Sequence, residues 1–262
     1  MNLRRITFGL LFTYGVLTGY GMLLAAMRLP APFPLTPVST LLAFAFAILH
    51  AGQRVGWKKM LVMVVVVVLT GLTFESIGVA TGWVYGPYHY TDQLGVKFLN
   101  LVPLLIPVAW TMMMYPSLVI AESLTPDSLA GSRRWLVVAA LGGVVMTAWD
   151  VGMDPMMVSG GNWVWEVSGP YFGVPLQNFW GWWLTTFVAL AVYQLIARSI
   201  SEQPRGVAQS WALWAYLITA ASTVMVDIAI NLEGPALAGL FAMLPWVAMA
   251  FLREIKGKQT HG

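Results

Sequence analysis

Three carboxylates lie deep in apolar stretches of this sequence. Glu75, Asp150 and Asp227 each follow the start of a hydrophobic segment by about 16 residues, or about 24 Å of helix. Because the three segments are predicted to cross a membrane in the same direction, these acids share one layer near its outer side. An ionisable group inside a membrane is by default a candidate for function. Such a layer could support general acid–base chemistry.

A fourth acid, Asp154, follows Asp150 by one helical turn. This pair could hold Mg²⁺ and a diphosphate, as in membrane prenyltransferases. Those enzymes need a second Asp-rich motif and nearby cations, and the predicted outer layer has almost no Lys or Arg. The three histidines, His50, His89 and His261, are too scattered for a metal cluster. We therefore predict no metal and no other cofactor, with His89 as a hydrogen-bonding or proton-relaying residue beside the acids.

The segments that follow Glu75 and Asp150 are rich in aromatic residues. Rings gather at the interfaces of any membrane protein, and we assign most tryptophans of residues 176–196 to such a belt. A belt does not require the Gly-Pro steps at Gly86 and Gly169, which could fold these loops back onto the helix ends. The predicted substrate-binding residues are Trp83, Tyr85, Tyr88, Tyr90, Trp149, Trp163, Trp165, Tyr171 and Asn178.

The elements that must position these residues are membrane-spanning helices. The chain has 262 residues, of which 58% are hydrophobic and 10% charged, whereas a soluble domain carries about 25% charged residues. We predict an all-α polytopic membrane protein with about eight spans in a single domain, residues 1–262. With no cysteine, thiolate metal sites are excluded. The predicted helices are Ile6–Met27, Pro34–Ala51, Lys59–Ile77, Phe98–Ile120, Trp135–Asp150, Leu176–Ile196, Ser210–Ile230 and Pro235–Leu252.

The basic residues predict the orientation in the bilayer. With eight spans, 12 of the 14 Lys and Arg residues fall on one side, and only Arg28 and Lys97 fall on the other. Basic residues favour the cytoplasmic side, so both termini are predicted to be cytoplasmic. The first segment is longer than the core of a signal peptide and is predicted to remain uncleaved. The net charge of +3 gives no reason to expect a nucleic-acid partner.

The acids also mark a diverged repeat of helix–loop–helix units. Glu75, Asp150 and Asp227 are almost evenly spaced, and each precedes a Gly-Pro step. In the first two units a Gly-Val step precedes an asparagine, Asn100 or Asn178, by the same interval. Repeats and intramembrane acids also suit a transporter. A transport pathway needs polar groups on both sides of the midplane, and we expect few in the inner half.

Two long motifs resemble a known family. The first includes Phe74-Glu75-Ser76-Ile77-Gly78, Tyr85-Gly86-Pro87-Tyr88-His89-Tyr90 and Ala109-Trp110. The second includes Asp150-Val151-Gly152-Met153-Asp154-Pro155, Trp163-Val164-Trp165 and Gly173-Val174-Pro175-Leu176-Gln177-Asn178. Together they resemble the membrane carotenoid 1,2-hydratases, a family often labelled carotenoid biosynthesis protein, over about residues 74–185.

The resemblance implies an enzyme that hydrates the acyclic ψ-end of a carotenoid such as γ-carotene, lycopene or bisanhydrobacterioruberin. It implies that the protein lies in a bacterial or archaeal cytoplasmic membrane. Its expected partners are water and a carotenoid dissolved in the lipid bilayer, and contacts with other carotenoid enzymes are compatible with the resemblance. Glu75, His89, Asp150, Asp154 and Asn178 fall on motif positions.

Hydration of the terminal C1–C2 double bond needs a proton at C2 and a water molecule that captures the tertiary cation at C1. We predict Asp150 or Glu75 as the proton donor and Asp154 or Asp227 as the base. The faces of the Trp and Tyr rings could stabilise the cation. An end-group cyclase makes the same cation but excludes water, so the residues alone leave that alternative open.

Overall fold

The computed structural model describes residues 2–32, 34–203 and 206–259. Within these ranges eight helices are long and apolar enough to cross a membrane. The predicted all-α membrane fold and its eight spans are therefore confirmed. The helices are α1 (Leu3–Ala26), α2 (Leu35–Val55), α3 (Trp57–Thr81), α4 (Leu105–Leu124), α5 (Gly131–Ser159), α6 (Leu176–Ala197), α7 (Ser210–Ala229) and α8 (Glu233–Gln259).

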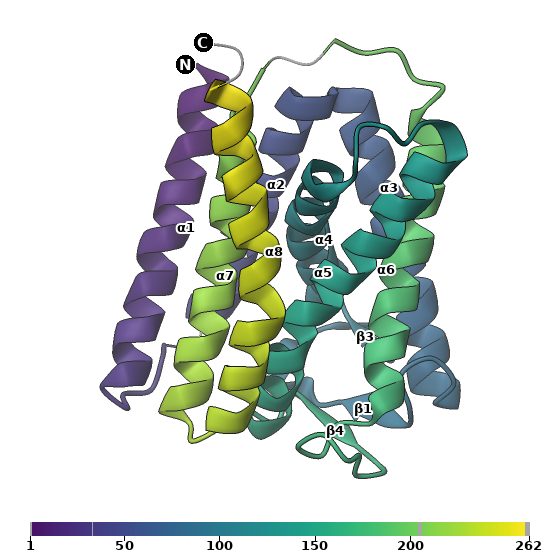
Figure 1. The fold of residues 1–262 in the computed structure, drawn as a ribbon. Helices are drawn as coiled ribbons and strands as arrows, with labels where there is room; N and C mark the ends of the chain where they lie inside the picture. The colour runs from purple at the N-terminus through teal and green to yellow at the C-terminus, as the bar shows by residue number, and fades with distance from the viewer. Residues whose placement is uncertain (1, 33, 204–205, 260–262) are drawn as a thin grey trace.

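The helices alternate in direction, so that the connections lie on two opposite faces (Figure 1). The start of α1 and the end of α8 lie together on what we call the inner face, drawn at the top. The strands lie on the opposite, outer face. Arg28 and Lys97 belong to outer connections, as the charge pattern predicts. That the inner face is cytoplasmic remains a prediction.

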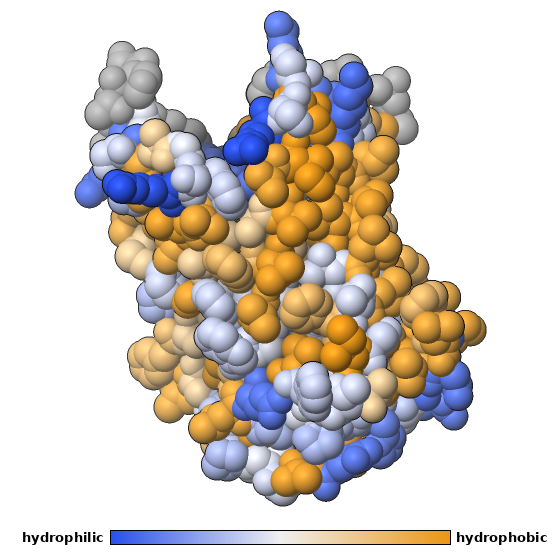
Figure 2. Space-filling model, turned by 90° about the vertical axis from the view of Figure 1, so that its right-hand side faces the viewer, coloured by the Kyte–Doolittle hydropathy of each residue, from blue (hydrophilic) through white to orange (hydrophobic). Residues whose placement is uncertain are grey.

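Hydrophobic side chains face outward between the two ends of the molecule. On the side shown in Figure 2 they predominate at mid-height, and the most hydrophilic side chains gather toward the ends. Phe12 is 63% exposed and Phe241 70% exposed, because lipid is their solvent. Helices α4 and α5 form the buried centre of the bundle, with α5 packed against α4, α6 and α8.

Two short antiparallel ribbons cover the outer face. Strand β1 (Tyr88–Tyr90) pairs with β4 (Trp163–Trp165), which joins the connection after α3 to the connection after α5. Strands β2 (Lys97–Phe98) and β3 (Val102–Pro103) form the second ribbon, after the 3₁₀ turn η1 (Asp92–Leu94). The outer connections are therefore folded structure rather than loose loops.

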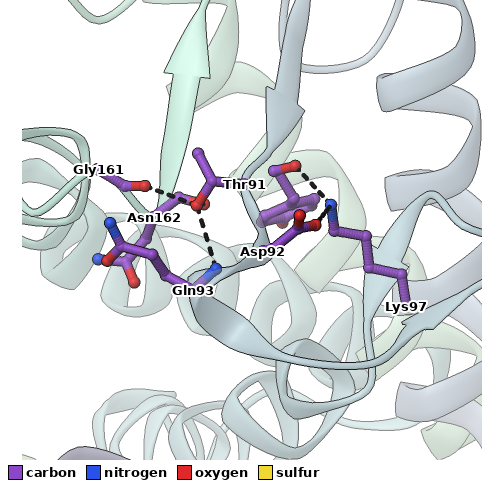
Figure 3. A network of polar contacts seen from close by, with 7 residues as sticks. Thr91, Asp92, Gln93, Lys97, Gly161 and Asn162 are labelled. Atoms are coloured by element: carbon purple, nitrogen blue, oxygen red, sulfur yellow. Dashed lines mark hydrogen bonds and ion pairs between the residues drawn. The ribbon is translucent and has the colours of Figure 1, made fainter. Parts of the chain in front are cut away.

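Side-chain and backbone hydrogen bonds extend the β1–β4 pairing (Figure 3). The Thr91 hydroxyl donates to the carbonyl oxygen of Gly161 at 2.7 Å, and the Thr91 backbone N–H donates to that of Asn162 at 3.0 Å. Lys97 Nζ donates to Asp92 Oδ1 and to the Tyr90 carbonyl oxygen, both at 2.8 Å. These bonds fix the ribbon over the helix ends.

Three predicted helix bounds are wrong by seven residues or more, and one of them is the end of α8, which lies at Gln259 rather than Leu252. Helix α4 begins at Leu105 rather than Phe98, because residues 97–103 form the β2–β3 ribbon. Helix α5 continues to Ser159, nine residues past the predicted end at Asp150. Asp150 lies inside the continuous helix, where Asn178 of α6 donates a hydrogen bond to its Oδ2, as described below.

The predicted repeat is visible in the outer loops and fades elsewhere. The first two units each supply one strand of the β1–β4 ribbon, whereas the third unit has only the short connection between α7 and α8. Asn178 is 1% exposed within α6. Its counterpart Asn100 lies in an exposed turn with a φ of 58°. The two asparagines therefore have different structural roles.

The expectation of few polar groups in the inner half is wrong. His50 Nδ1 lies 2.5 Å from the Tyr115 hydroxyl, and Arg54 pairs with Glu122 at 2.7 Å. His50 and Tyr115 are almost fully buried, and Arg54 and Glu122 mostly so. In the sequence these residues resemble a solvated helix end, but the packing of α2 against α4 buries them.

Candidate active site

A cavity of about 1240 Å³ occupies the outer half of the bundle. Helices α1 to α7 all contribute to its walls, and the β1–β4 ribbon contributes four aromatic side chains. Most of the lining is apolar or aromatic. Two carboxylates, Glu75 of α3 and Asp154 of α5, are exceptions, and each is at most 3% exposed. The cavity therefore brings two buried acids from different helices into one apolar space.

Glu75 accepts hydrogen bonds from three aromatic side chains. Its Oε2 accepts from the hydroxyls of Tyr88 and Tyr90, the latter at 2.8 Å. Its Oε1 accepts from Trp110 Nε1 at 2.9 Å. Burial raises the pKa of both tyrosines well above the ordinary value. The tyrosines consequently remain neutral and keep their O–H groups.

Asp154 is held by N–H donors. Its Oδ1 accepts from Trp163 Nε1 and Trp165 Nε1, each at 3.1 Å. Its Oδ2 accepts from Asn178 Nδ2 at 2.8 Å. Three donors from β4 and α6 thus fix this carboxylate.

The alternation of side chains along a strand explains which ribbon residues reach the acids. Neighbouring residues of a strand point to opposite faces. Tyr88 and Tyr90 point inward on β1, so His89 between them points outward, with an exposed side chain 3.5 Å from Glu166. On β4 the two tryptophans contact Asp154, and Val164 is exposed. His89 therefore lies outside the cavity that contains Glu75 and Asp154.

Three tryptophans form the apolar wall beside the acids. The rings of Trp110 and Trp182 stack with centroids 4.2 Å apart, and Trp149 meets Trp182 edge-on at 5.9 Å. Sequence reasoning predicted only Trp149 here. It assigned most tryptophans of residues 176–196, the segment that contains Trp182, to the interfacial belt and gave Trp110 no role, although Trp110 closes the first motif. The residue type alone does not show whether an aromatic side chain lies at the membrane interface or lines a cavity.

The part of the cavity wall formed by α1 and α7 carries hydroxyl groups that the sequence analysis did not identify. Tyr14 and Thr18 of α1 and Thr219 and Thr223 of α7 line it. The Tyr14 hydroxyl lies 2.6 Å from Thr219 Oγ1, and Trp149 Nε1 donates to Thr223 Oγ1 at 3.1 Å. No motif marks these residues, since α1 and α7 resemble any apolar span. Arg28 lines the cavity from the connection between α1 and α2.

The other two predicted acids are buried but do not line the cavity. Asp150 Oδ2 accepts from Asn178 Nδ2 at 2.7 Å, whereas its Oδ1 has no hydrogen-bond partner among the described residues. Asp227 lies against Gly152 of α5, and neither of its carboxylate oxygens has such a partner. Among the predicted acids, the helix faces direct Glu75 and Asp154 into the cavity, and Asp150 and Asp227 away from it.

The remaining predicted aromatics divide between the cavity and its surroundings. Tyr85 lines the cavity, and its hydroxyl lies 2.8 Å from Thr185 Oγ1. Tyr171 lies behind the wall and donates to the Val151 carbonyl oxygen at 2.9 Å. Trp83 is 80% exposed on the outer face. Tyr171 and Trp83 are therefore placed away from the two acids.

The described residues contain no cluster of three or more His, Asp or Glu side chains suited to a metal ion. His261 lies outside the described residues. The absence of a metal from the reaction remains a prediction. The groups around Glu75 and Asp154 are O–H and N–H donors, which form hydrogen bonds with carboxyl oxygens.

Comparison with known proteins gives the class to which this fold and site belong. A family model described as carotenoid biosynthesis protein matches residues 35–245. The chain therefore belongs to the carotenoid biosynthesis protein family, and it is an integral membrane protein of eight apolar helices.

One relative in particular is a bisanhydrobacterioruberin hydratase from Haloarcula japonica. It is 35% identical over 121 residues, which are 45% of this chain and 39% of that protein. The match therefore spans well under half of the relative's length. With the family match, it confirms the resemblance to carotenoid hydratases. No solved structure matches the chain.

Proposed function

We propose that this protein hydrates the C1–C2 double bond at the acyclic ψ-end of a carotenoid without a cofactor. The observation that carries the proposal is the pair of buried carboxylates, Glu75 and Asp154, in one aromatic cavity. Acid-catalysed hydration needs one group to give a proton and another to take one. The name of the Haloarcula japonica relative supports carotenoid hydration.

The hydrogen-bond partners of Glu75 and Asp154 indicate which acid gives the proton and which takes one. A tyrosine hydroxyl both donates and accepts hydrogen bonds, so Tyr88 and Tyr90 can turn to accept from a protonated Glu75. Indole N–H and amide N–H groups only donate, so the partners of Asp154 suit an ionised carboxylate. We therefore assign Glu75 as the proton donor and Asp154 as the base.

The reaction balances with water alone. Glu75 gives its proton to C2, and the π electrons of the double bond form the new C–H bond, leaving a tertiary cation at C1. A water molecule beside Asp154 adds to C1, and its released proton passes to Asp154. Return of one proton from Asp154 to Glu75 restores the starting state, so the net change is the addition of one water.

The tryptophan wall fits the cationic intermediate. A desolvated ring face attracts a cation by about 2 kcal/mol in favourable cases. Trp110, Trp149 and Trp182 line the cavity beside Glu75.

The substrate reaches the cavity from the membrane. An acyclic carotenoid is a long hydrocarbon dissolved in the bilayer, and the cavity lies between helices in the outer half. We propose lateral entry between helices, with the end group at the acids and the chain directed toward lipid. From the distribution of basic residues, we place the protein in a cytoplasmic membrane with this cavity near the outer side.

Expression in a host that accumulates lycopene or γ-carotene tests the function. Liquid chromatography with mass detection should show a gain of one water for each modified end. A pigment isomer of unchanged mass would instead indicate an end-group cyclase. Unaltered pigment from folded, membrane-inserted protein, with bisanhydrobacterioruberin also left unchanged, would contradict the proposal.

Amide variants test the assigned residues. Glu75→Gln and Asp154→Asn should each abolish detectable hydration, because neither amide can exchange a proton with substrate or water. Glu166→Gln is the matched control, since Glu166 lies on the outer face outside the cavity. Yield and thermal unfolding in detergent should match the wild type for Glu75→Gln and Glu166→Gln, whereas Asp154→Asn should stay folded with a lower midpoint, because its amide nitrogen faces N–H donors. Turnover near the wild-type rate in either cavity variant would remove that acid from the mechanism.

A further inference from the structure

One amide group connects the two acids of α5. Asn178 Nδ2 donates to Asp150 Oδ2 at 2.7 Å and to Asp154 Oδ2 at 2.8 Å. An amide nitrogen carries two hydrogens, so this pair of bonds uses both. We propose that Asn178 and Asp150 are positioning residues: Asp150 anchors the Asn178 amide, and Asn178 fixes the Asp154 carboxylate in the cavity. This inference rests on the proposed function.

Asn178 makes the contact to Asp154 Oδ2, which the β1–β4 ribbon does not reach. The two indoles of β4 hold Asp154 Oδ1 from one side. Asp154 Oδ2 receives its hydrogen bond from Asn178 of α6. Without that bond, the carboxylate could rotate about the contacts made by Trp163 and Trp165. Asn178 therefore determines which oxygen faces the reacting water.

Asp150 has the position of an anchor rather than of a reacting group. It is fully buried, and it lies behind the cavity wall. Residues four apart on a helix lie on the same face, so Asp150 and Asp154 both point toward Asn178 on α6. Asp150 Oδ2 is occupied by the amide, and its Oδ1 contacts no donor in the part of the chain that the structure describes. Any proton on Asp150 would have no direct route into the cavity.

The amide also keeps two acids apart. Like charges one helical turn apart repel each other, and burial strengthens the repulsion. Asn178 places a neutral donor between them, so that each acid binds a hydrogen rather than facing the other acid. An asparagine at position 150 would preserve this arrangement, because its amide oxygen can accept the same hydrogen bond.

Four variants test the inference by activity. Asp150→Asn should retain turnover within about threefold of the wild type, while Asp154→Asn abolishes it. Asp150→Leu and Asn178→Leu should lower kcat roughly ten- to a hundredfold, the value of a hydrogen bond to a charged group, with little change in KM. Asp127→Asn, on the exposed inner connection, is the control. Loss of turnover in a folded Asp150→Asn protein would overturn the inference while leaving the function intact.

An infrared measurement decides the inference even if the reaction is another one. The carboxylate band of Asp154 is identified as the band that disappears in Asp154→Asn. It should shift in Asn178→Leu and in Asp150→Leu, and stay in place in Asp150→Asn. An unchanged band in the two leucine variants would overturn the inference. If wild-type protein hydrates no carotenoid but the shifts appear, the proposed function fails and the positioning role stands.

Discussion

At the scale of single residues, the chemistry of the site depends on which hydrogen-bond donors surround each acid. Glu75 meets two hydroxyls and one indole, whereas Asp154 meets only N–H groups. The difference separates a group that can carry a proton from one suited to remain a carboxylate. It also gives Trp110 a role, since its indole is the sole N–H donor to Glu75 among the described residues.

We predict that Trp110→Phe lowers turnover roughly tenfold or more, because the ring can still stack on Trp182 while the hydrogen bond to Glu75 is lost. Kinetics on detergent-solubilised protein with an acyclic carotenoid would measure this loss. Trp183→Phe is the control, since it removes an indole bond to the Ala140 carbonyl oxygen outside the cavity. Equal rates for the two variants would argue against a role for the Trp110 indole.

At the scale of elements, close packing between helices positions the ribbon and the loop that leads into it. The Tyr85 ring lies between Gly78 of α3 and Gly181 of α6. A Cβ at Gly78 would lie 2.6 Å from the ring, and one at Gly181 would lie 2.5 Å from it. Only glycine leaves room for the ring at both positions. The ring therefore links α3 and α6, and it belongs to the connection that leads into β1, the strand that carries Tyr88 and Tyr90.

We predict that Gly181→Ala destabilises the protein by about 1–3 kcal/mol, the usual cost of overpacking. The new methyl group would also meet the Val84 carbonyl oxygen, which cannot move aside easily. Thermal unfolding in detergent would report the change. Gly9→Ala should shift the midpoint little, because a Cβ at Gly9 has no neighbour within 4 Å. A wild-type midpoint for Gly181→Ala would show that the loop relaxes without cost.

At the scale of the whole molecule, the two faces differ in charge and in structure. Among the described residues, nearly all Lys and Arg lie toward the inner face, and the outer face carries the ribbons and the cavity. Within the described residues, the inner end also holds the buried pairs of His50 with Tyr115 and Arg54 with Glu122. These pairs join α2 to α4 and lie apart from the lining of the cavity.

The absence of cysteine makes the orientation directly testable. We predict that a membrane-impermeant maleimide labels Val167→Cys in intact cells, because Val167 is 60% exposed on the outer face. Asp127→Cys, on the exposed inner connection, should react only after the membrane is opened. The reverse labelling pattern would mean that the cavity lies near the cytoplasm.

The sequence by itself determined the membrane class and the eight spans. Those features depend on composition, on segment length and on the rise of a helix, which are properties of the chain alone. The motif resemblance also located Glu75, Asp154, Asn178 and the ribbon aromatics.

Only the tertiary structure decided which of these residues meet. Asp150 and Asp227 are buried like Glu75 but do not line the cavity, because the direction of a side chain follows from how its helix packs. His89 sits inside a motif yet faces outward, because the β1–β4 register directs its neighbours inward. Trp110, Trp182 and Tyr14 come from separate helices and meet at one cavity, a proximity that is set by how the helices pack.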